Sequence, residues 1–260
     1  MLVDSSPDYC HKVNDLSTIS PVASNLITRL GADDVTRSEI IELIEQDEVI
    51  YTNVFKFVRS AAFELPRYPR NIAEAFDWLG VHGLKDLIFS IISKKFFMDL
   101  EGWRESLLTA KLARYFAEQL NLPDHEASDI FMRAQLELLA QSIFKKFYSN
   151  QYAPIESISI NSLAEWYQVL DYEALLFGIS SLDLTDQIVE KFQLPLSLVD
   201  FSDKNLLLVQ LAKTMIKAEL EDQIDVDQIL DDDIVKKYNL TDLKVDLVLL
   251  KELSSYIKLL

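Results

Sequence analysis

The chain has 260 residues, of which 49% are hydrophobic, so it can bury a sizeable core and differs in composition from disordered proteins. Its formal charge of −17 opposes binding to phosphate backbones and anionic lipid, so we expect neither nucleic acid nor membrane as a partner. No apolar run approaches the roughly 20 residues of a membrane span, and no N-terminal stretch resembles a secretory signal. The single cysteine, Cys10, allows no internal disulfide, and together these features predict a cytoplasmic protein.

The first half of the chain predicts helices. Glycine and proline are scarce, and apolar residues recur at three- and four-residue spacing. Thr36 and Glu39 have the spacing of a capping box, which predicts a helix start. A second helix is expected after Asp47, with its apolar face formed by positions 50, 54, 57, 58 and 61. Asn71 is expected to cap a short helix that ends at Gly80, where a left-handed backbone conformation suits glycine.

The second half continues the same pattern. Residues 84–97 are apolar on most faces and predict a buried central helix. We interpret residues 155–160 as an extended linker rather than a short strand. Further helices are expected over residues 103–120, 126–147, 162–170, 184–192 and 205–220. The predicted fold is therefore all-α, a multi-helix bundle of about ten helices.

The domain organisation follows from this pattern. We expect an N-terminal tail over residues 1–15, a helical domain over 16–220 and a C-terminal helical extension over 221–260 that packs on it. The extension has a leucine-rich face that starts at Leu240 and ends at Ile257. That face either docks on the domain or forms a partner or homodimer helix.

Three stretches, taken in order, resemble the HDOD family, the helical output domains of bacterial signalling that are related to the HD phosphohydrolases. The first is residues 40–63, where Leu43-Ile44-Glu45-Gln46-Asp47 leads into Phe57-Val58-Arg59-Ser60-Ala61. The others are residues 71–80, with their alanine and leucine-glycine pattern, and residues 184–195, which end in an aromatic residue and leucine-proline. The resemblance implies an HD-like helical bundle and a signalling context.

The departures from the family pattern concern the metal ligands of the HD enzymes. Where many relatives have glycine-leucine-leucine-histidine-aspartate, this chain has Ala134-Gln135-Leu136-Glu137-Leu138. Ser181 stands where a later histidine is expected, and residues 200–204 lack the expected histidine pair. The resemblance therefore identifies a degenerate member without the HD metal ligands, for which we expect no metal and no cofactor.

The three histidines do not suggest another metal site. His11, His82 and His125 are far apart in sequence, and none has a second histidine at the spacing typical of metal ligands. The five glycines form no phosphate-binding loop. We therefore predict no catalytic residues and no enzyme activity.

One predicted loop is basic, in contrast to the acidic chain as a whole. Arg59, Arg67 and Arg70 lie close in sequence to Tyr68 and two prolines. Arginine forks beside an aromatic ring can bind carboxylate or phosphate groups in a bidentate manner. We predict a partner-binding loop formed by Arg59, Arg67, Tyr68 and Arg70; the alternative is a solvated loop whose arginine stems cover the core.

The sequence is compatible with two functions. The first is a non-catalytic signal-transduction or regulatory module that acts through protein–protein contacts or a ligand-dependent conformational change. The second is a divergent metal-dependent phosphohydrolase with a carboxylate-only site that includes Glu137 and Asp183. A small-molecule pocket between helices would suit a sensor.

Overall fold

The computed structural model describes residues 21–30, 35–58, 69–97, 99–156, 158, 163–192, 194–199, 201–220, 229, 233–238, 240 and 243. Within these ranges the secondary structure is entirely helical, in agreement with the predicted all-α bundle. The N-terminal helices are α2 (Pro21–Leu30), α3 (Arg37–Glu45), α4 (Glu48–Val58) and α5 (Ile72–Ser93), followed by the short 3₁₀ helix η2 (Lys94–Phe96). The remaining helices are α6 (Leu100–Gln119), α7 (Asp124–Phe147), α8 (Ser149–Glu156), α9 (Leu163–Phe177), α10 (Ser181–Lys191), η3 (Leu196–Leu198), α11 (Asp203–Leu220) and α13 (Asp233–Lys237).

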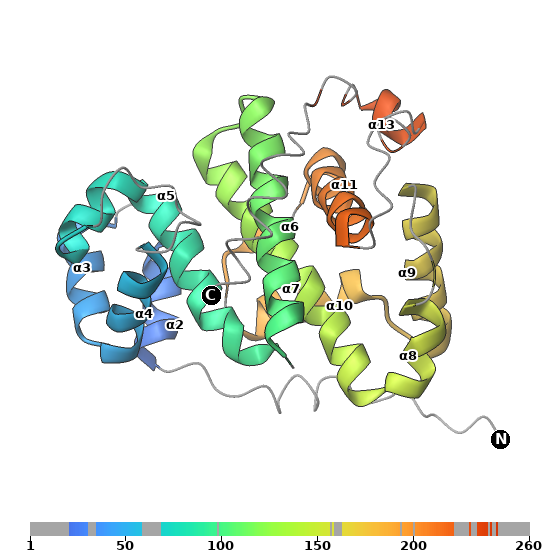
Figure 1. Ribbon diagram of the computed structural model, residues 1–260, viewed down its shortest axis with the longest axis horizontal. Helices are drawn as coiled ribbons and strands as arrows, with labels where there is room; N and C mark the ends of the chain where they lie inside the picture. Colours follow the sequence, from blue (N-terminus) through green and yellow to red (C-terminus); the bar gives the residue numbers. More distant parts are fainter. Residues whose placement is uncertain are drawn as a thin grey trace.

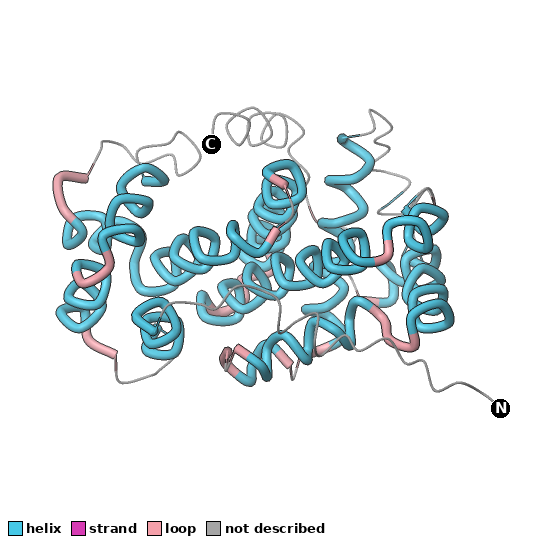
Figure 2. The backbone as a smooth tube through the Cα atoms, turned by 90° about the horizontal axis from the view of Figure 1, so that it is seen from below, coloured by secondary structure: helices cyan, strands magenta, loops and turns pink. Residues whose placement is uncertain are grey.

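The helices are arranged along one direction. Figure 1 shows α2, α3 and α4 gathered at one end of the molecule and α8 and α9 at the opposite end, with α6 and α7 between them. The perpendicular view in Figure 2 shows helices joined by short loops and no strand in the part of the chain drawn in colour. The hairpin of α6 and α7 is the most extensive helix pair and forms the centre of the bundle.

Local sequence explains where several helices begin. The Thr36 hydroxyl accepts a hydrogen bond from the Glu39 backbone N–H at 3.3 Å, which starts α3 as predicted. The Glu39 carboxylate does not complete the capping box and instead pairs with Arg29 of α2 at 2.5 Å. Asn71 caps α5 as predicted, with its side-chain oxygen accepting from the Glu74 N–H at 2.8 Å.

Gly80 interrupts α5 rather than ending it. Its backbone has φ 68° and ψ −178°, a conformation that side-chain-bearing residues rarely adopt. The predicted short helix after Asn71 and the predicted buried helix over residues 84–97 are therefore the two arms of one kinked helix, extended by η2. The second arm is buried as predicted: Leu84, Leu87 and Ile88 are fully buried.

The interpretation of residues 155–160 as an extended linker is wrong at its start. Ile155 and Glu156 form the last turn of α8, a helix that the sequence reasoning missed. Pro154 lies inside α8, and because proline usually breaks helices, this helix is hard to predict from sequence. The side chains of Tyr152 and Ile155 are buried against the bundle and stabilise this turn.

The C-terminal region is described only in part. Four of its apolar side chains lie in the same hydrophobic core as the rest of the bundle: Ile229, Val235, Leu240 and Leu243. The predicted leucine-rich face beyond Leu243, the predicted tail over residues 1–15 and the loop residues Arg59, Arg67 and Tyr68 lie outside the described residues. The domain boundaries stay a prediction. None of the helices that the structure describes combines the length and hydrophobicity needed to cross a membrane.

Candidate functional site

A buried polar network surrounds Glu137, the residue at the position where relatives of the predicted family have histidine. Glu137 is 1% exposed and lies on α7, where residues 127–140 are buried on every face. Arg133, one turn earlier, donates from Nε to Glu137 Oε1 at 3.3 Å. From α11, Gln210 Nε2 and Lys213 Nζ donate to Oε2 at 2.5 Å and 3.3 Å. Both carboxylate oxygens therefore already have donors.

Arg133 connects this carboxylate to two further elements. Its NH1 group donates to Asp186 Oδ1 on α10 at 2.5 Å and to the Leu198 carbonyl in η3 at 2.6 Å. The guanidinium also lies 5.8 Å from the centre of the Phe201 ring. The fork geometry of arginine suits it to joining several acceptors at once. The network thus ties α7, α10, η3 and α11 together.

These residues do not fit a divalent metal. Such ions are held by neutral imidazoles, thiolates and carboxylates, several of which must converge on one point. Around Glu137 the converging groups are a guanidinium, an ammonium and an amide N–H₂, which repel a cation or offer it no lone pair. Among the residues that the structure describes, no three His, Cys, Asp or Glu side chains come together in metal-binding geometry.

The structure does not bring Glu137 and Asp183 together. The Asp183 carboxylate is exposed and accepts from the Ser180 backbone N–H at 3.2 Å and from the Ser180 hydroxyl at 2.7 Å, which completes a capping box at the start of α10. The partners of Glu137 lie on α7 and α11 instead. This geometry does not support the carboxylate-only metal site that the sequence left open.

Two further residues in the stretches compared with the family pattern, Gln135 and Ser181, also have structural partners. Gln135, fully buried on α7, donates to the Ser90 hydroxyl at 2.7 Å and accepts from the Ser93 hydroxyl at 2.8 Å, so it ties α7 to α5. The Ser181 backbone N–H donates to the buried carboxylate of Glu173 at 2.7 Å. Burial raises the pKa of Glu173 above its usual value.

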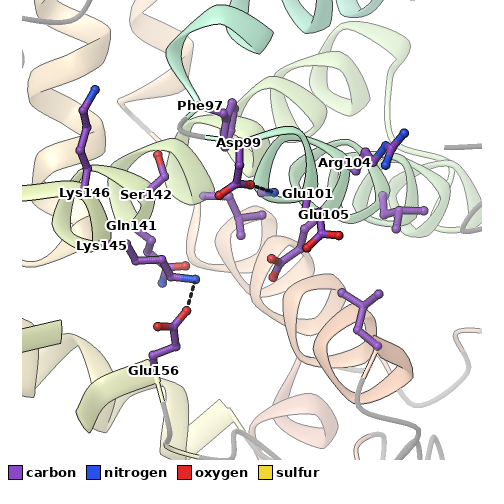
Figure 3. A pocket seen from close by; sticks show the side chains of 14 residues that line it. Phe97, Asp99, Glu101, Arg104, Glu105, Gln141, Ser142, Lys145, Lys146 and Glu156 are labelled. Atoms are coloured by element: carbon purple, nitrogen blue, oxygen red, sulfur yellow. Dashed lines mark hydrogen bonds and ion pairs between the residues drawn. The ribbon is translucent and has the colours of Figure 1, made fainter. Parts of the chain in front are cut away.

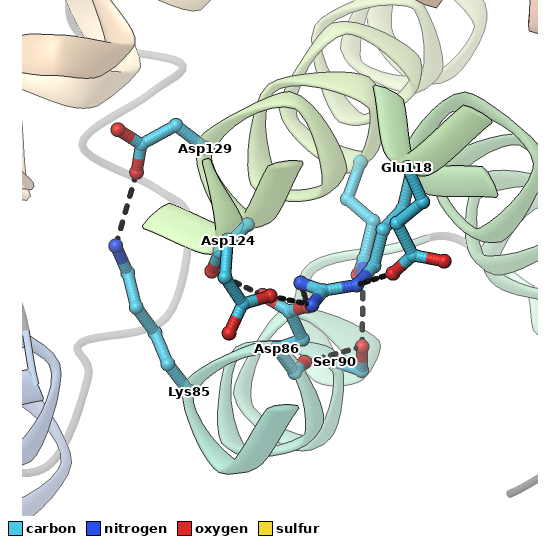
Figure 4. A network of polar contacts seen from close by, with 9 residues as sticks. Lys85, Asp86, Ser90, Glu118, Asp124 and Asp129 are labelled. Carbon is cyan, nitrogen blue, oxygen red and sulfur yellow. Dashed lines mark hydrogen bonds and ion pairs between the residues drawn. The ribbon is translucent and has the colours of Figure 1, made fainter. Parts of the chain in front are cut away.

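A second polar network joins α5, α6 and α7 (Figure 4). Asp86 accepts from Arg114 NH1 and from the Ser128 hydroxyl, each at 2.5 Å, and Arg114 also pairs with Glu118 and Asp124. Next to it, Lys85 and Asp129 form a buried ion pair at 3.0 Å. Burial raises the pKa of Asp86 to about 7, although the charge of Arg114 and the hydrogen bond from Ser128 act to lower it.

The histidines are less scattered than their sequence positions suggest. The ring centres of His82 and His125 lie 6.5 Å apart, because α5 packs beside the start of α7. Desolvation lowers the pKa of His82, and the nearby Asp124 carboxylate opposes that shift. The sequence spacing of these two histidines does not indicate this proximity, and His11 lies outside the described residues.

The predicted arginine loop is only partly placed. Arg70 is exposed just before α5, and its backbone N–H donates to the Glu74 carboxylate at 2.7 Å. The other three predicted residues are not described, so the partner-binding loop stays a prediction.

A groove that the sequence reasoning missed lies between α6, α7, α8 and α11. It encloses about 640 Å³ and continues into a smaller pocket of about 230 Å³ that reaches α9. Figure 3 shows Lys145 and Glu156, paired at 2.9 Å, on one side of the groove and Glu105 on the other. Lys213, which binds Glu137, also lines the smaller pocket, so the Glu137 network and the groove share a residue.

One sequence signal could have found this groove. Glu105 shares a helix face with Leu108 and Leu112, so a carboxylate stands where the amphipathic pattern of α6 demands an apolar residue. Such a placement often indicates a polar site rather than core. The amphipathic pattern of α6 alone does not show which helices form the opposite wall of the groove.

The fold and the Glu137 region together define an all-α helical bundle in which buried ion pairs surround Glu137. The profile of the HDOD domain matches residues 16–205, so the chain belongs to the HDOD domain family, as the sequence motifs predicted.

Solved structures share this fold at low sequence identity. An HDOD domain protein of unknown function from Geobacter sulfurreducens superposes with a TM-score of 0.69 and 17% identity over 97% of this chain and 96% of its own. A protein from Shewanella amazonensis SB2B, which is provisionally named a phosphohydrolase, superposes with a TM-score of 0.66 and 17% identity over 96% of this chain and 92% of its own.

A sequence relative is also found in Treponema pallidum (strain Nichols). This uncharacterized protein is 27% identical over 107 residues, which are 41% of this chain. The matched part is only 21% of that protein's length, so the relative is much longer than the shared segment.

Proposed function

We propose that this HDOD protein is a non-catalytic regulatory module that acts in signal transduction through protein–protein contacts or a ligand-dependent conformational change. One observation carries the proposal: at the position where the family resemblance implies a histidine, the Glu137 carboxylate is paired with Arg133 and Lys213 and accepts a hydrogen bond from Gln210. Two cationic groups beside this carboxylate would repel a metal ion. What remains for the chain is recognition, in a cytoplasmic and bacterial setting that the family resemblance suggests.

The experiment that tests the absence of catalysis measures metal and turnover together. The purified protein is analysed for bound transition metals and assayed for phosphodiester hydrolysis with added Mg²⁺ or Mn²⁺, beside an active HD phosphohydrolase as the positive control. We expect no stoichiometric metal and no turnover above buffer. Tightly bound metal together with hydrolysis would overturn the proposal.

Partner binding through the predicted arginine loop is tested separately. Proteins captured from the native host by the wild-type chain are compared with those captured by an Arg67→Glu/Arg70→Glu variant. A Lys236→Glu/Lys237→Glu variant, which reverses two charges on the exposed surface of α13, is the matched control. We expect one partner to be lost with the arginine variant alone; unchanged capture would remove this loop from the proposed mechanism.

A further inference from the structure

The inner end of the groove carries ammonium groups with unused hydrogen-bond donors. Lys213 Nζ donates to Glu137 at 3.3 Å, and Lys217 Nζ donates to the Ile158 carbonyl at 2.8 Å. Each ammonium has three N–H donors, so each lysine has donors left for a further acceptor. Lys145 also lines this space and forms an ion pair with Glu156 of α8. In a chain of net charge −17, three lysines therefore converge here on one small space.

Glu105 faces these lysines without pairing with them. Its carboxyl group lines both parts of the groove and has no hydrogen-bond or ion-pair partner among the described residues. Burial raises the pKa of Glu105, and the charges of Lys145, Lys213 and Lys217 act against that rise, whereas Glu156 adds to it. A carboxyl group that protonates readily can donate a hydrogen bond, as the lysines do.

The groove wall also carries apolar side chains among its polar ones. Trp166, at its inner end, is 1% exposed, and its indole N–H has no acceptor. Leu220, which is 49% exposed, lines both parts of the groove. Leu108 and Leu138 contribute further apolar surface. The enclosed volume is within the range of about 300–1,000 Å³ that is typical of small-molecule sites.

We propose that this groove binds a small amphipathic anion. Its carboxylate, phosphate or sulfonate head group accepts hydrogen bonds from Lys213 and Lys217, and from Glu105 when that carboxyl group is protonated. Its apolar body extends along Leu108 and Leu138 toward Leu220. Lys213 also donates a hydrogen bond to Glu137. A ligand that binds Lys213 would therefore alter the network that joins α7 to α10 and α11, and ligand binding could change how these helices pack. This site goes beyond the proposed regulatory role and does not depend on the absence of catalysis.

Ligand binding should be linked to proton uptake at Glu105. An anion placed beside a carboxylate favours the protonated carboxyl group, so affinity should rise as the pH falls toward the pKa of Glu105. The other charged groups facing Glu105 are Lys145 on α7, Lys213 and Lys217 on α11 and Glu156 on α8. A probe that stays ionised throughout is needed so that only the protein titrates.

The test is calorimetric titration of the full chain with 1-octanesulfonate, compared with neutral 1-octanol and cationic octylamine. We expect the sulfonate to bind about tenfold or more tightly than the alcohol, because it gains charge-assisted hydrogen bonds. Lys217→Met should weaken sulfonate binding about tenfold or more, and Lys217→Arg should retain most of it. Lys56→Met, on α4 at the other end of the molecule, removes the same charge and should change nothing.

Proton linkage supplies a second measurement. The sulfonate affinity of the wild-type chain should rise as the pH falls from about 8 to about 5, whereas the affinity of the Glu105→Gln variant should not change over this range. Octanoate and octyl phosphate, titrated at about pH 7.5, distinguish the two natural head groups. Equal affinity for octanol and octanesulfonate, no binding of either, or equal weakening by Lys217→Met and Lys56→Met would each overturn the proposal.

Discussion

At the scale of single residues, this protein is defined by polar side chains in a buried helix. Arg133, Gln135 and Glu137 all lie on the fully buried part of α7, where an unpaired charge would cost several kcal/mol. Each of them has partners on other helices, so their burial is compensated by contacts that lie far away in sequence.

Removal of Arg133 should destabilise the fold strongly. Arg133→Met leaves Glu137 buried beside Lys213 alone as a charged partner, and we expect a loss of about 3–5 kcal/mol of unfolding free energy. The double variant Arg133→Met/Glu137→Gln should recover about 1 kcal/mol or more of that loss, because it no longer buries an uncompensated carboxylate. Urea unfolding of both single variants and the double variant measures this coupling; additive losses would show that the pair is not coupled.

Asp86 should make stability depend on pH. Its pKa is about 7 in the folded chain against 3.8 in the unfolded chain, so the unfolded state releases this proton first as the pH rises. The folded state therefore loses stability between about pH 4 and about pH 7, by up to about 4 kcal/mol at roughly 1.4 kcal/mol per pKa unit. Asp86→Asn, which is neutral at every pH, should show a flatter pH profile of urea midpoints over that range. Parallel profiles for the two proteins would contradict this prediction.

At the scale of elements, the kink in α5 determines how its two arms pack. Phe76 and Leu79 of the first arm contact the core from one direction, and Leu84 and Leu87 of the second arm from another. Only a residue without a side chain adopts the Gly80 backbone conformation at low cost.

Gly80→Ala should therefore destabilise the fold by about 1–3 kcal/mol. A β-carbon at Gly80 would meet nothing within 4 Å, so the cost arises from the backbone alone. Gly83→Ala is the matched control, because Gly83 lies in regular helix and its added carbon would meet Leu79 Cβ at 3.3 Å. We expect that variant to change stability by less than about 1 kcal/mol in either direction. Thermal unfolding of both variants gives the comparison; an equal effect would show that the kink is not responsible.

At the scale of the whole molecule, α6 and α7 lie between two groups of helices. The small end formed by α2, α3 and α4 packs on α5, whereas the groove and the Glu137 network lie on the α8–α11 side. The chain as a whole carries a large excess of carboxylates.

This excess should make the folded state sensitive to salt. The charges repel one another over a Debye length of about 30 Å at 10 mM salt and only about 8 Å at 150 mM. Since the formal charge is −17, we expect the unfolding midpoint to rise between these two salt concentrations, measured by thermal unfolding with NaCl and again with KCl. A fall in the midpoint with both salts would mean that screening of attractive ion pairs outweighs the relief of repulsion.

Much of the fold could be predicted because its signals are local. The caps at Thr36 and Asn71, the positive φ of Gly80 and the helices that became α6, α7 and α11 all follow from residues within a few positions of one another. The helix α8 could not, because Pro154 disfavours a helix locally and the burial of Tyr152 and Ile155 depends on neighbouring helices.

The sequence alone determined that this chain is an all-α member of its family, since helix periodicity and motif order can be read along the chain. Only the tertiary structure decided what surrounds Glu137, because Arg133 shares its helix but Gln210 and Lys213 arrive from 73 and 76 residues away. The existence of the groove likewise depends on tertiary structure. Its walls come from four separate helices, and periodicity within one helix carries no information about which other helix packs against it.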